Sequence, residues 1–136
     1  MSEQQILSDA QIAQFKRDGY LVVRGMYSAE EVADISRWTS EVAAMPEVPG
    51  KYMMSFEKSH KAGSRILCRI ENFVPFHQGF SKLITDCRMQ QAVSELFGED
   101  AVLFKDKINF KLPGGDGFKE HQDVQAGWDA FADLHI

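Results

Sequence analysis

The chain has 136 residues, of which 44% are hydrophobic and 26% are charged, and it carries a net charge of -5. A chain of this size and composition predicts one globular domain. The acidic balance, without any basic run, excludes nucleic acid as an expected partner, and the lack of a long apolar stretch excludes a membrane span.

The first residues, MSEQQILSDAQ, lack the basic start and the apolar centre of a secretory signal. The two cysteines, Cys68 and Cys87, are too few for a disulfide scaffold and too far apart for a Cys-x-x-Cys pair. We therefore expect a cytoplasmic protein with two reduced, buried thiols.

Two helices and a strand are predicted in the first part of the chain. Each helical segment opens with a serine that is followed by Gln or Glu at the third helical position, which is the pattern of a capping box. We expect helices over 8–18 and 28–45, a strand over the apolar run 20–26, and a loop over 45–50, which contains two prolines and a glycine.

Strands become more frequent after residue 50. Residues 51–73 predict two strands around a polar turn. In the second of these strands, alternation places Ile66, Cys68 and Ile70 on one face, and Arg65, Leu67, Arg69 and Glu71 on the other.

A helical pattern over 80–97 ends before Gly98, and a further strand is predicted over 101–111. The polar face of that strand contains Leu103, Lys105, Lys107, Asn109 and Lys111, and its apolar face is interrupted by Asp106. This order of elements predicts a mixed α/β (α+β) fold. Because another strand begins near Ile136, and a sheet cut there would have an open edge, we expect the first half of a larger β-rich domain.

A His-x-Asp unit follows a glycine-rich turn in the stretch GGDGFKEHQDVQAGW (114–128). Residues i and i+2 of a strand project from one face, so His121 and Asp123 would point together and Gln122 away. With one further histidine, such a pair makes the facial triad that binds Fe(II) in non-haem oxygenases. The alternative is a surface loop in which His121 and Asp123 share a hydrogen bond.

Two stretches carry a family resemblance. The first is AQIAQFKRDGYLVV followed by SAEEVADI, and the second is NFKLPGGDGFKE directly before HQD. Together they resemble the phytanoyl-CoA dioxygenase family of Fe(II)/2-oxoglutarate oxygenases. The resemblance extends over nearly the whole chain and implies a double-stranded β-helix (a cupin-like jelly roll) with the N-terminal helices packed outside it. Residues 1–136 would then be the N-terminal portion of a single dioxygenase domain.

The resemblance also implies a ligand set. His121 and Asp123 would be the first two iron ligands, with Fe(II) as cofactor, 2-oxoglutarate as co-substrate and O2 as oxidant. Asn109 and Lys107 would border the 2-oxoglutarate pocket, and Trp128 would line it, although core packing is an equal alternative for this tryptophan.

Substrate contacts are expected from the earlier strand. Arg65 and Arg69 are predicted to face one side of it and to meet an acidic group of substrate or co-substrate, and Gln122 is assigned to the same site. The alternative for both arginines is a solvated strand face, where charged residues are common.

Two parts of the family pattern are missing. The family has a third ligand, a histidine, and an arginine that binds the 2-oxoglutarate carboxylate, both downstream of the His-x-Asp pair. We do not assign His135 as that ligand because it lies where the next strand should begin, and we expect His60 and His77 to be surface or loop residues. Without the second half, iron binding is expected to be weak and turnover absent.

The implied activity is hydroxylation of a small molecule, coupled to decarboxylation of 2-oxoglutarate to succinate. The stretches YMMSFEKS and RILCRIENF resemble aminophosphonate hydroxylases of this family, and the basic residues on the strands favour a small charged substrate. The alternatives are an acyl-CoA hydroxylase, an iron-free jelly-roll binding module, and a metal-dependent cupin-like enzyme that does not use 2-oxoglutarate. No oligomeric state is predicted.

Overall fold

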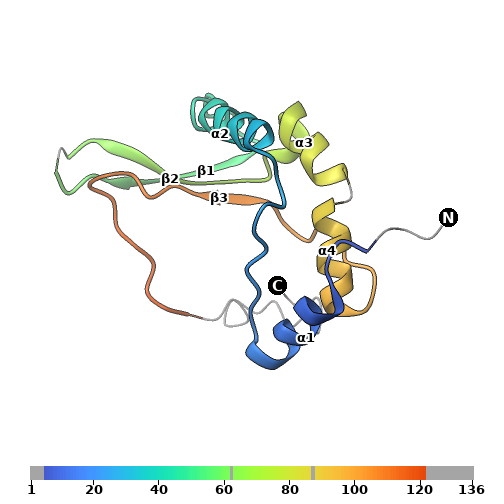
Figure 1. The fold of residues 1–136 in the computed structure, drawn as a ribbon. Helices are drawn as coiled ribbons and strands as arrows, with labels where there is room; N and C mark the ends of the chain where they lie inside the picture. Colours follow the sequence, from blue (N-terminus) through green and yellow to red (C-terminus); the bar gives the residue numbers. More distant parts are fainter. Residues whose placement is uncertain (1–4, 62, 87, 122–136) are drawn as a thin grey trace.

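The computed structural model describes residues 5–61, 63–86 and 88–121 (Figure 1). The elements in chain order are α1 (Asp9–Asp18), α2 (Ala29–Ala43), β1 (Met53–Lys58), β2 (Arg65–Glu71), the short 3-10 helix η1 (Val74–Phe76), α3 (Gln78–Thr85), α4 (Arg88–Phe97) and β3 (Lys107–Asn109). The mixed helix and sheet class expected from the sequence is confirmed. Within this described part, none of the helices combines the length and apolarity that crossing a bilayer requires.

The two capping boxes are confirmed. Ser8 accepts a hydrogen bond from the Gln11 amide, and the Gln11 side chain accepts one from the Ser8 amide. Ser28 and Glu31 make the same reciprocal pair at the start of α2. These bonds satisfy amide groups that the first turn of a helix leaves without partners, which is why both helices begin where the sequence indicates.

The strand predicted over 20–26 is wrong. This segment is an extended connection between α1 and α2, and it pairs with no strand in the described part of the chain. Tyr20 and Val22 are 61% and 60% exposed. An apolar, β-branched sequence favours extended backbone, but a strand also needs a neighbour for its amide and carbonyl groups.

The sheet is antiparallel, in the order β1-β2-β3. Met54 pairs with Ile70 and Phe56 pairs with Leu67, so the register shifts by one residue and Cys68 is an additional residue in β2. Cross-strand partners share a face, and this bulge interrupts the alternation. Leu67 therefore lies on the same face as Ile70, and the face assignment made from alternation alone is wrong.

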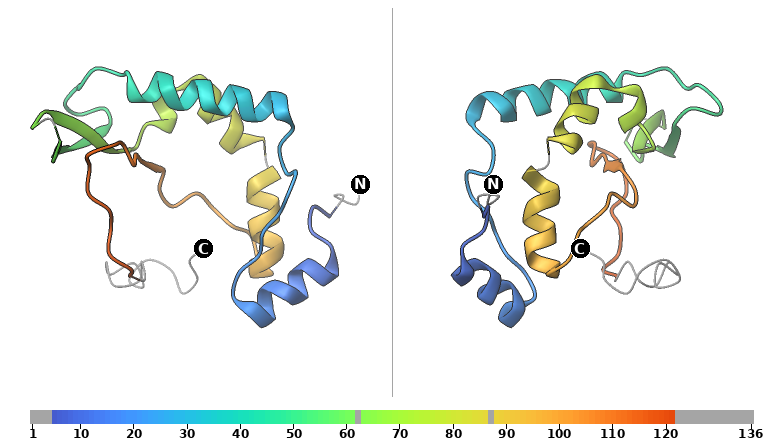
Figure 2. Two further views of the ribbon diagram at one scale, coloured as in Figure 1. Left: turned by 60° about the vertical axis from the view of Figure 1, so that its left-hand side comes forward. Right: turned by 90° about the vertical axis from the view of Figure 1, so that its right-hand side faces the viewer.

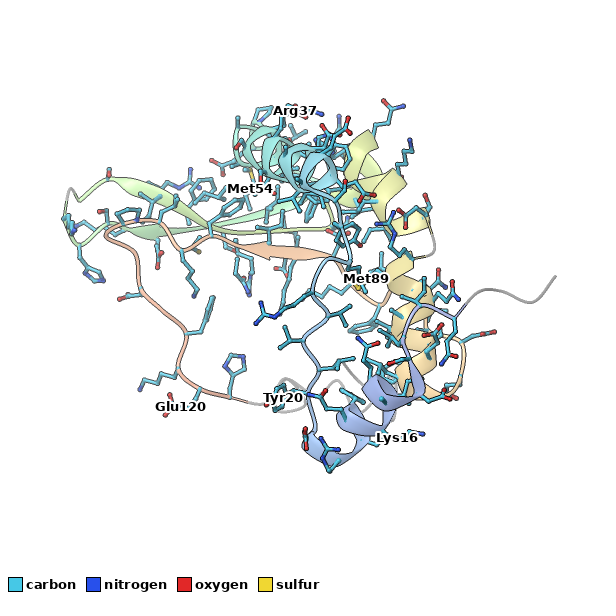
Figure 3. The ribbon with its side chains drawn as sticks, in the orientation of Figure 1. Lys16, Tyr20, Arg37, Met54, Met89 and Glu120 are labelled. Atoms are coloured by element: carbon cyan, nitrogen blue, oxygen red, sulfur yellow. The ribbon has the colours of Figure 1, made fainter. Side chains whose placement is uncertain are left out.

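Helices α2 and α3 lie side by side on one face of this sheet, whereas α1 contacts α4 away from it (Figures 1 and 2). The central core cluster is formed by Val42, Tyr52, Ile70, Phe73 and Phe80. Met54 packs against this cluster from the α2 side of the sheet (Figure 3). Ile70 and Val42 are fully buried, so the centre of β2 and the end of α2 form the middle of the core.

The helical pattern over 80–97 corresponds to two helices, α3 and α4, and Gly98 follows the second in a left-handed conformation, with φ +78°. His77 lies in the loop between η1 and α3, one of the two places expected for it, but it is buried, at 8% exposed, and not on the surface. Its Nδ1 accepts the Phe80 amide, which caps α3, and its Nε2 lies 3.1 Å from Glu41 Oε2. Because a backbone amide can only donate, the proton of the neutral ring is on Nε2 and faces the carboxylate.

The strand predicted over 101–111 is much shorter in the structure. The strand β3 spans Lys107–Asn109, and the Phe110 amide also donates to the Cys68 carbonyl of β2 at 2.8 Å. Val102, Leu103 and Phe104 are 81%, 53% and 52% exposed. Asp106, which interrupts the apolar pattern, has a structural role, since its carboxylate accepts the Phe73 amide at 2.8 Å. It thus joins the start of β3 to the turn that follows β2.

Candidate functional site

Arg69 and Glu71 of β2 and Lys107 of β3 share the sheet face opposite α2 and α3. Arg69 pairs with Asn109 and Glu71 with Lys107, whereas Ile70 and Ile108, which pair with each other between them, belong to the core side. Neighbouring residues of a strand point to opposite faces, so the register alone separates the two sets. The structure therefore brings together Arg69, Lys107 and Asn109, three of the residues predicted for the site.

Glu71 is the centre of this charged face. Its carboxylate is nearly buried, at 5% exposed, and it lies 3.1 Å from Arg69 Nε and 2.5 Å from Lys105 Nζ. Arg69 Nε faces Glu71 Oε2, and Lys105 Nζ faces Glu71 Oε1. Both contacts are within ion-pair distance, but neither Arg69 Nε nor Glu71 Oε1 makes a hydrogen bond of good geometry to the described residues. These contacts are thus ion pairs that lack the geometry of directional hydrogen bonds. Lys107, the cross-strand partner of Glu71, adds a further basic residue to this face.

Arg65 lies on the opposite face, so the expectation that it faces the same side as Arg69 is wrong. Its guanidinium makes two hydrogen bonds to Glu47, at 2.5 and 2.9 Å, and covers the Phe56 ring at 3.5 Å. The Arg65 hydrogen bonds lower the pKa of the Glu47 carboxyl. The bulge at Cys68 explains the error, since one added residue reverses the face of every residue beyond it.

His121 lies at the end of the described part of the chain, in a segment that leaves β3 on the side of the sheet away from α2 (Figures 1 and 3). It is exposed and is not in a strand. Its Nδ1 is 2.7 Å from the Lys119 carbonyl oxygen. Asp123, Gln122, Trp128 and His135 lie outside the described residues, so the geometry of the His-x-Asp pair remains a prediction.

The state of the His121 ring suits a metal ligand. A carbonyl oxygen can only accept, so the proton of the neutral imidazole is on Nδ1 and the lone pair is on Nε2. Metal-binding histidines commonly use this arrangement, in which a carbonyl orients the ring through one nitrogen while the other is the ligand. Within residues 5–61, 63–86 and 88–121, no cluster of three or more His, Cys, Asp or Glu side chains is arranged to hold a metal ion.

The turn before His121 rests on the hairpin formed by β1 and β2. The His60 amide donates to the Gly114 carbonyl at 2.8 Å, and His60 Nε2 lies 2.8 Å from Asp116 Oδ1. The side chain of His60 is 65% exposed, as expected for a surface residue. The glycine-rich turn is therefore attached to the sheet, although its contacts lie at the solvent-exposed end of the hairpin.

Glu71 and Lys105 are the members of the charged face that the sequence did not single out. Alternation predicts Glu71 on the same face as Arg69 but not its near-complete burial, and it predicts Lys105 on the polar face of 101–111 but not its contact with Glu71. The signal that could have found Glu71 is its i, i+2 spacing from Arg69 in a strand, which puts opposite charges side by side.

Comparison with known proteins gives a consistent assignment. The chain is 46% identical over 116 residues to a 2-aminoethylphosphonate dioxygenase of an uncultured bacterium, HF130_AEPn_1, covering 85% of this chain and 44% of that protein. It is 35% identical to a methylphosphonate hydroxylase of Gimesia maris, covering 88% and 45%, and 30% identical to a probable alpha-ketoglutarate-dependent hypophosphite dioxygenase of Stutzerimonas stutzeri, covering 77% and 37%.

The chain thus spans less than half the length of these curated relatives. No solved structure matches it. Residues 15–133 match the family described as phytanoyl-CoA dioxygenase (PhyH), and this range includes the extended segment after α1, the whole sheet and the His-x-Asp unit. The expected resemblance is confirmed, and the chain belongs to the phytanoyl-CoA dioxygenase family.

Proposed function

We propose that the full-length protein is an Fe(II)/2-oxoglutarate-dependent dioxygenase that hydroxylates a small phosphonate. The observation that carries this proposal is the 46% identity, over 85% of the chain, to a protein named 2-aminoethylphosphonate dioxygenase. A second relative is named for methylphosphonate. Residues 1–136 would form the N-terminal part of one jelly-roll domain, and a small antiparallel sheet with helices on one face is compatible with this architecture.

His121 and Asp123 are proposed to hold the metal. An imidazole nitrogen and a carboxylate oxygen are the donors that a facial Fe(II) site uses, and the His121 tautomer directs its Nε2 lone pair away from the Lys119 carbonyl. Bound Fe(II) would supply the chemistry of O2 activation, by which the substrate is hydroxylated while 2-oxoglutarate is oxidised to succinate and CO2. The protein's task is then to bind, orient and shield the reactants.

The charged sheet face is proposed to bind the anionic groups of the reactants. Arg69, Lys107 and Asn109 offer cationic and amide donors on one surface, and a phosphonate or a keto acid carboxylate would accept hydrogen bonds from them. Glu71 forms an ion pair with Arg69, which fixes the position of the guanidinium before a ligand binds. Trp128 and Gln122 are proposed to complete the pocket.

An anaerobic titration of the full-length protein with Fe(II) and 2-oxoglutarate tests the metal assignment. The complex should give a metal-to-ligand charge-transfer band, and 2-aminoethylphosphonate should then drive succinate release in air. His121→Ala and Asp123→Ala should abolish both signals, whereas His135→Ala should keep the band. Loss of the band in His135→Ala would contradict the ligand assignment, and absence of a band in the unaltered protein would favour a binding module without iron.

The substrate assignment needs a separate comparison. We expect succinate release with 2-aminoethylphosphonate or methylphosphonate and not with an acyl-CoA thioester; the reverse result would overturn the phosphonate proposal while leaving the dioxygenase intact. Arg69→Ala should raise the KM of the anionic reactant about ten-fold, since a charge-assisted hydrogen bond is lost. Arg65→Ala, a change on the opposite face of the same strand, should have a smaller effect.

A further inference from the structure

The end of the β1–β2 hairpin holds the glycine turn that precedes His121. The His60 amide donates to the Gly114 carbonyl at 2.8 Å, and the Asp116 amide donates to Glu57 Oε2 at 3.1 Å. His60 Nε2 also lies 2.8 Å from Asp116 Oδ1. Two backbone groups and one side chain of the turn are thus fixed by residues far away in the sequence.

The backbone of the turn lies directly on the hairpin. A Cβ on Gly115 would overlap Glu57 Oε1, and it would lie 3.1 Å from Glu57 Cδ and 3.2 Å from Ile66 Cδ1. Gly114 has a φ of +90°, and a Cβ there would lie 2.6 Å from the Oγ of the buried Ser59. A side chain at Gly115 would have to displace the Glu57 carboxylate, and one at Gly114 would in addition be strained by the left-handed backbone.

Gly117, in the same segment, has room for a side chain, unlike Gly114 and Gly115. A Cβ at Gly117 would meet nothing within 4 Å. It lies closer to His121 in the sequence than Gly115 does. The attachment to the hairpin therefore ends before Gly117, which makes this glycine a matched control for the effect of an added methyl group.

We infer that Glu57, together with Gly114 and Gly115, positions the segment that bears His121, so that the hairpin lowers the ordering cost of metal binding. This inference rests on the proposed function, in which His121 is a metal ligand. A ligand on a loose segment must lose conformational freedom when it binds, and a segment fixed in advance loses less. Glu57 does this through the Asp116 amide, without contact to the metal.

The test is a double-mutant cycle on the full-length protein, read by anaerobic Fe(II) titration in the presence of 2-oxoglutarate. Gly115→Ala should displace the Glu57 carboxylate and weaken Fe(II) binding about ten-fold, because the freed segment must then be ordered when the metal binds. Gly117→Ala should leave the affinity unchanged. Glu57→Ala should weaken binding to a similar extent as Gly115→Ala, without adding an atom.

The double-mutant cycle distinguishes loss of the contact between Gly115 and Glu57 from a general loss of protein stability. If Gly115 acts through Glu57, Gly115→Ala should have little further effect in the Glu57→Ala background. Hydrogen exchange of the metal-free protein gives a second readout: protection of the amides from 114 to 121 should fall in Gly115→Ala and not in Gly117→Ala. Circular dichroism establishes that each variant is folded.

Equal Fe(II) affinities for wild type, Gly115→Ala and Gly117→Ala would overturn the inference. An equal loss of Fe(II) affinity in Gly115→Ala and Gly117→Ala would also overturn it. If the wild-type protein binds no Fe(II), the proposed function fails, and hydrogen exchange decides the inference by itself. Unchanged exchange in Gly115→Ala would then show that the hairpin does not order this segment.

Discussion

The two faces of one small sheet differ in almost every respect. On the side of α2 and α3, Ile70 is fully buried among apolar side chains. On the other side, its immediate neighbours Arg69 and Glu71 form an ion pair that Lys105 joins from outside the strand. Three consecutive residues of β2 thus belong to two environments, and only the direction of the side chain separates them.

This difference indicates a division of tasks. The apolar face contributes stability through close packing, since dispersion and water exclusion act on every buried atom. A buried ion cluster contributes less, because the loss of hydration offsets much of the attraction between the charges. The charged face is therefore expected to contribute less to stability than the apolar face, and the following predictions test this contrast.

The largest effect is expected on the apolar face. Ile70→Ala removes methyl groups from the centre of the core, where the side chain has no exposure. It should lower the free energy of unfolding by about 2–5 kcal/mol, as large-to-small changes in cores do. Urea unfolding measures this. The control Val102→Ala, at a side chain that is 81% exposed, should change the value by less than about 0.5 kcal/mol.

A smaller effect is expected on the charged face. Glu71→Gln keeps the shape of the side chain but removes the negative charge between Arg69 and Lys105. The free energy of unfolding should fall by about 1–2 kcal/mol, below the roughly 3–5 kcal/mol of a fully buried pair, because both cations are about a third exposed and can be hydrated.

Salt dependence distinguishes the two faces further. The loss caused by Glu71→Gln should shrink at high salt, which screens the repulsion between the two remaining cations, whereas the loss caused by Ile70→Ala should not. A loss in Glu71→Gln as large as that in Ile70→Ala, or one that salt does not change, would contradict the division between the faces.

The smallest effect is expected at an ion pair remote from the sheet. Arg88 makes a bidentate contact with Glu31 at 2.8 and 3.3 Å, and its hydrogen bond is the main cause that lowers the pKa of Glu31 from 4.5 to about 2. Since the folded-state pKa is the lower one, the pair stabilises the fold above about pH 4.5, and this contribution is lost as the pH falls toward 2.

Glu31→Gln isolates this charge effect, because glutamine still completes the capping box with Ser28. The difference in stability between wild type and Glu31→Gln should be greatest at neutral pH and should disappear as the pH approaches 2. Unfolding by urea across this pH range measures it. A difference that stays constant with pH would contradict the lowered pKa of Glu31 in the folded protein.

Elements that depend on near neighbours were predictable from the sequence. Ser8 and Ser28 begin their helices through bonds to residues in the first turn, and Gly98 ends α4 by its own conformation. The charged face was found only in part. Lys107 and Asn109 came from a family resemblance and Arg69 from the strand pattern, whereas Arg65 was assigned to the wrong face because nothing in the sequence signals the additional residue at Cys68.

By itself, then, the sequence determined the family, the capped helices, the hairpin of β1 and β2, and the residue types available for a metal and an anion. The tertiary structure decided which of those residues meet. The register between β1 and β2 separates Arg65 from Arg69, burial makes Glu71 the centre of an ion cluster, and contact with the hairpin accounts for Gly114 and Gly115. The physical reason is the separation in sequence of the interacting groups. Caps and turns depend on neighbouring residues, whereas register and burial depend on partners far away in the chain.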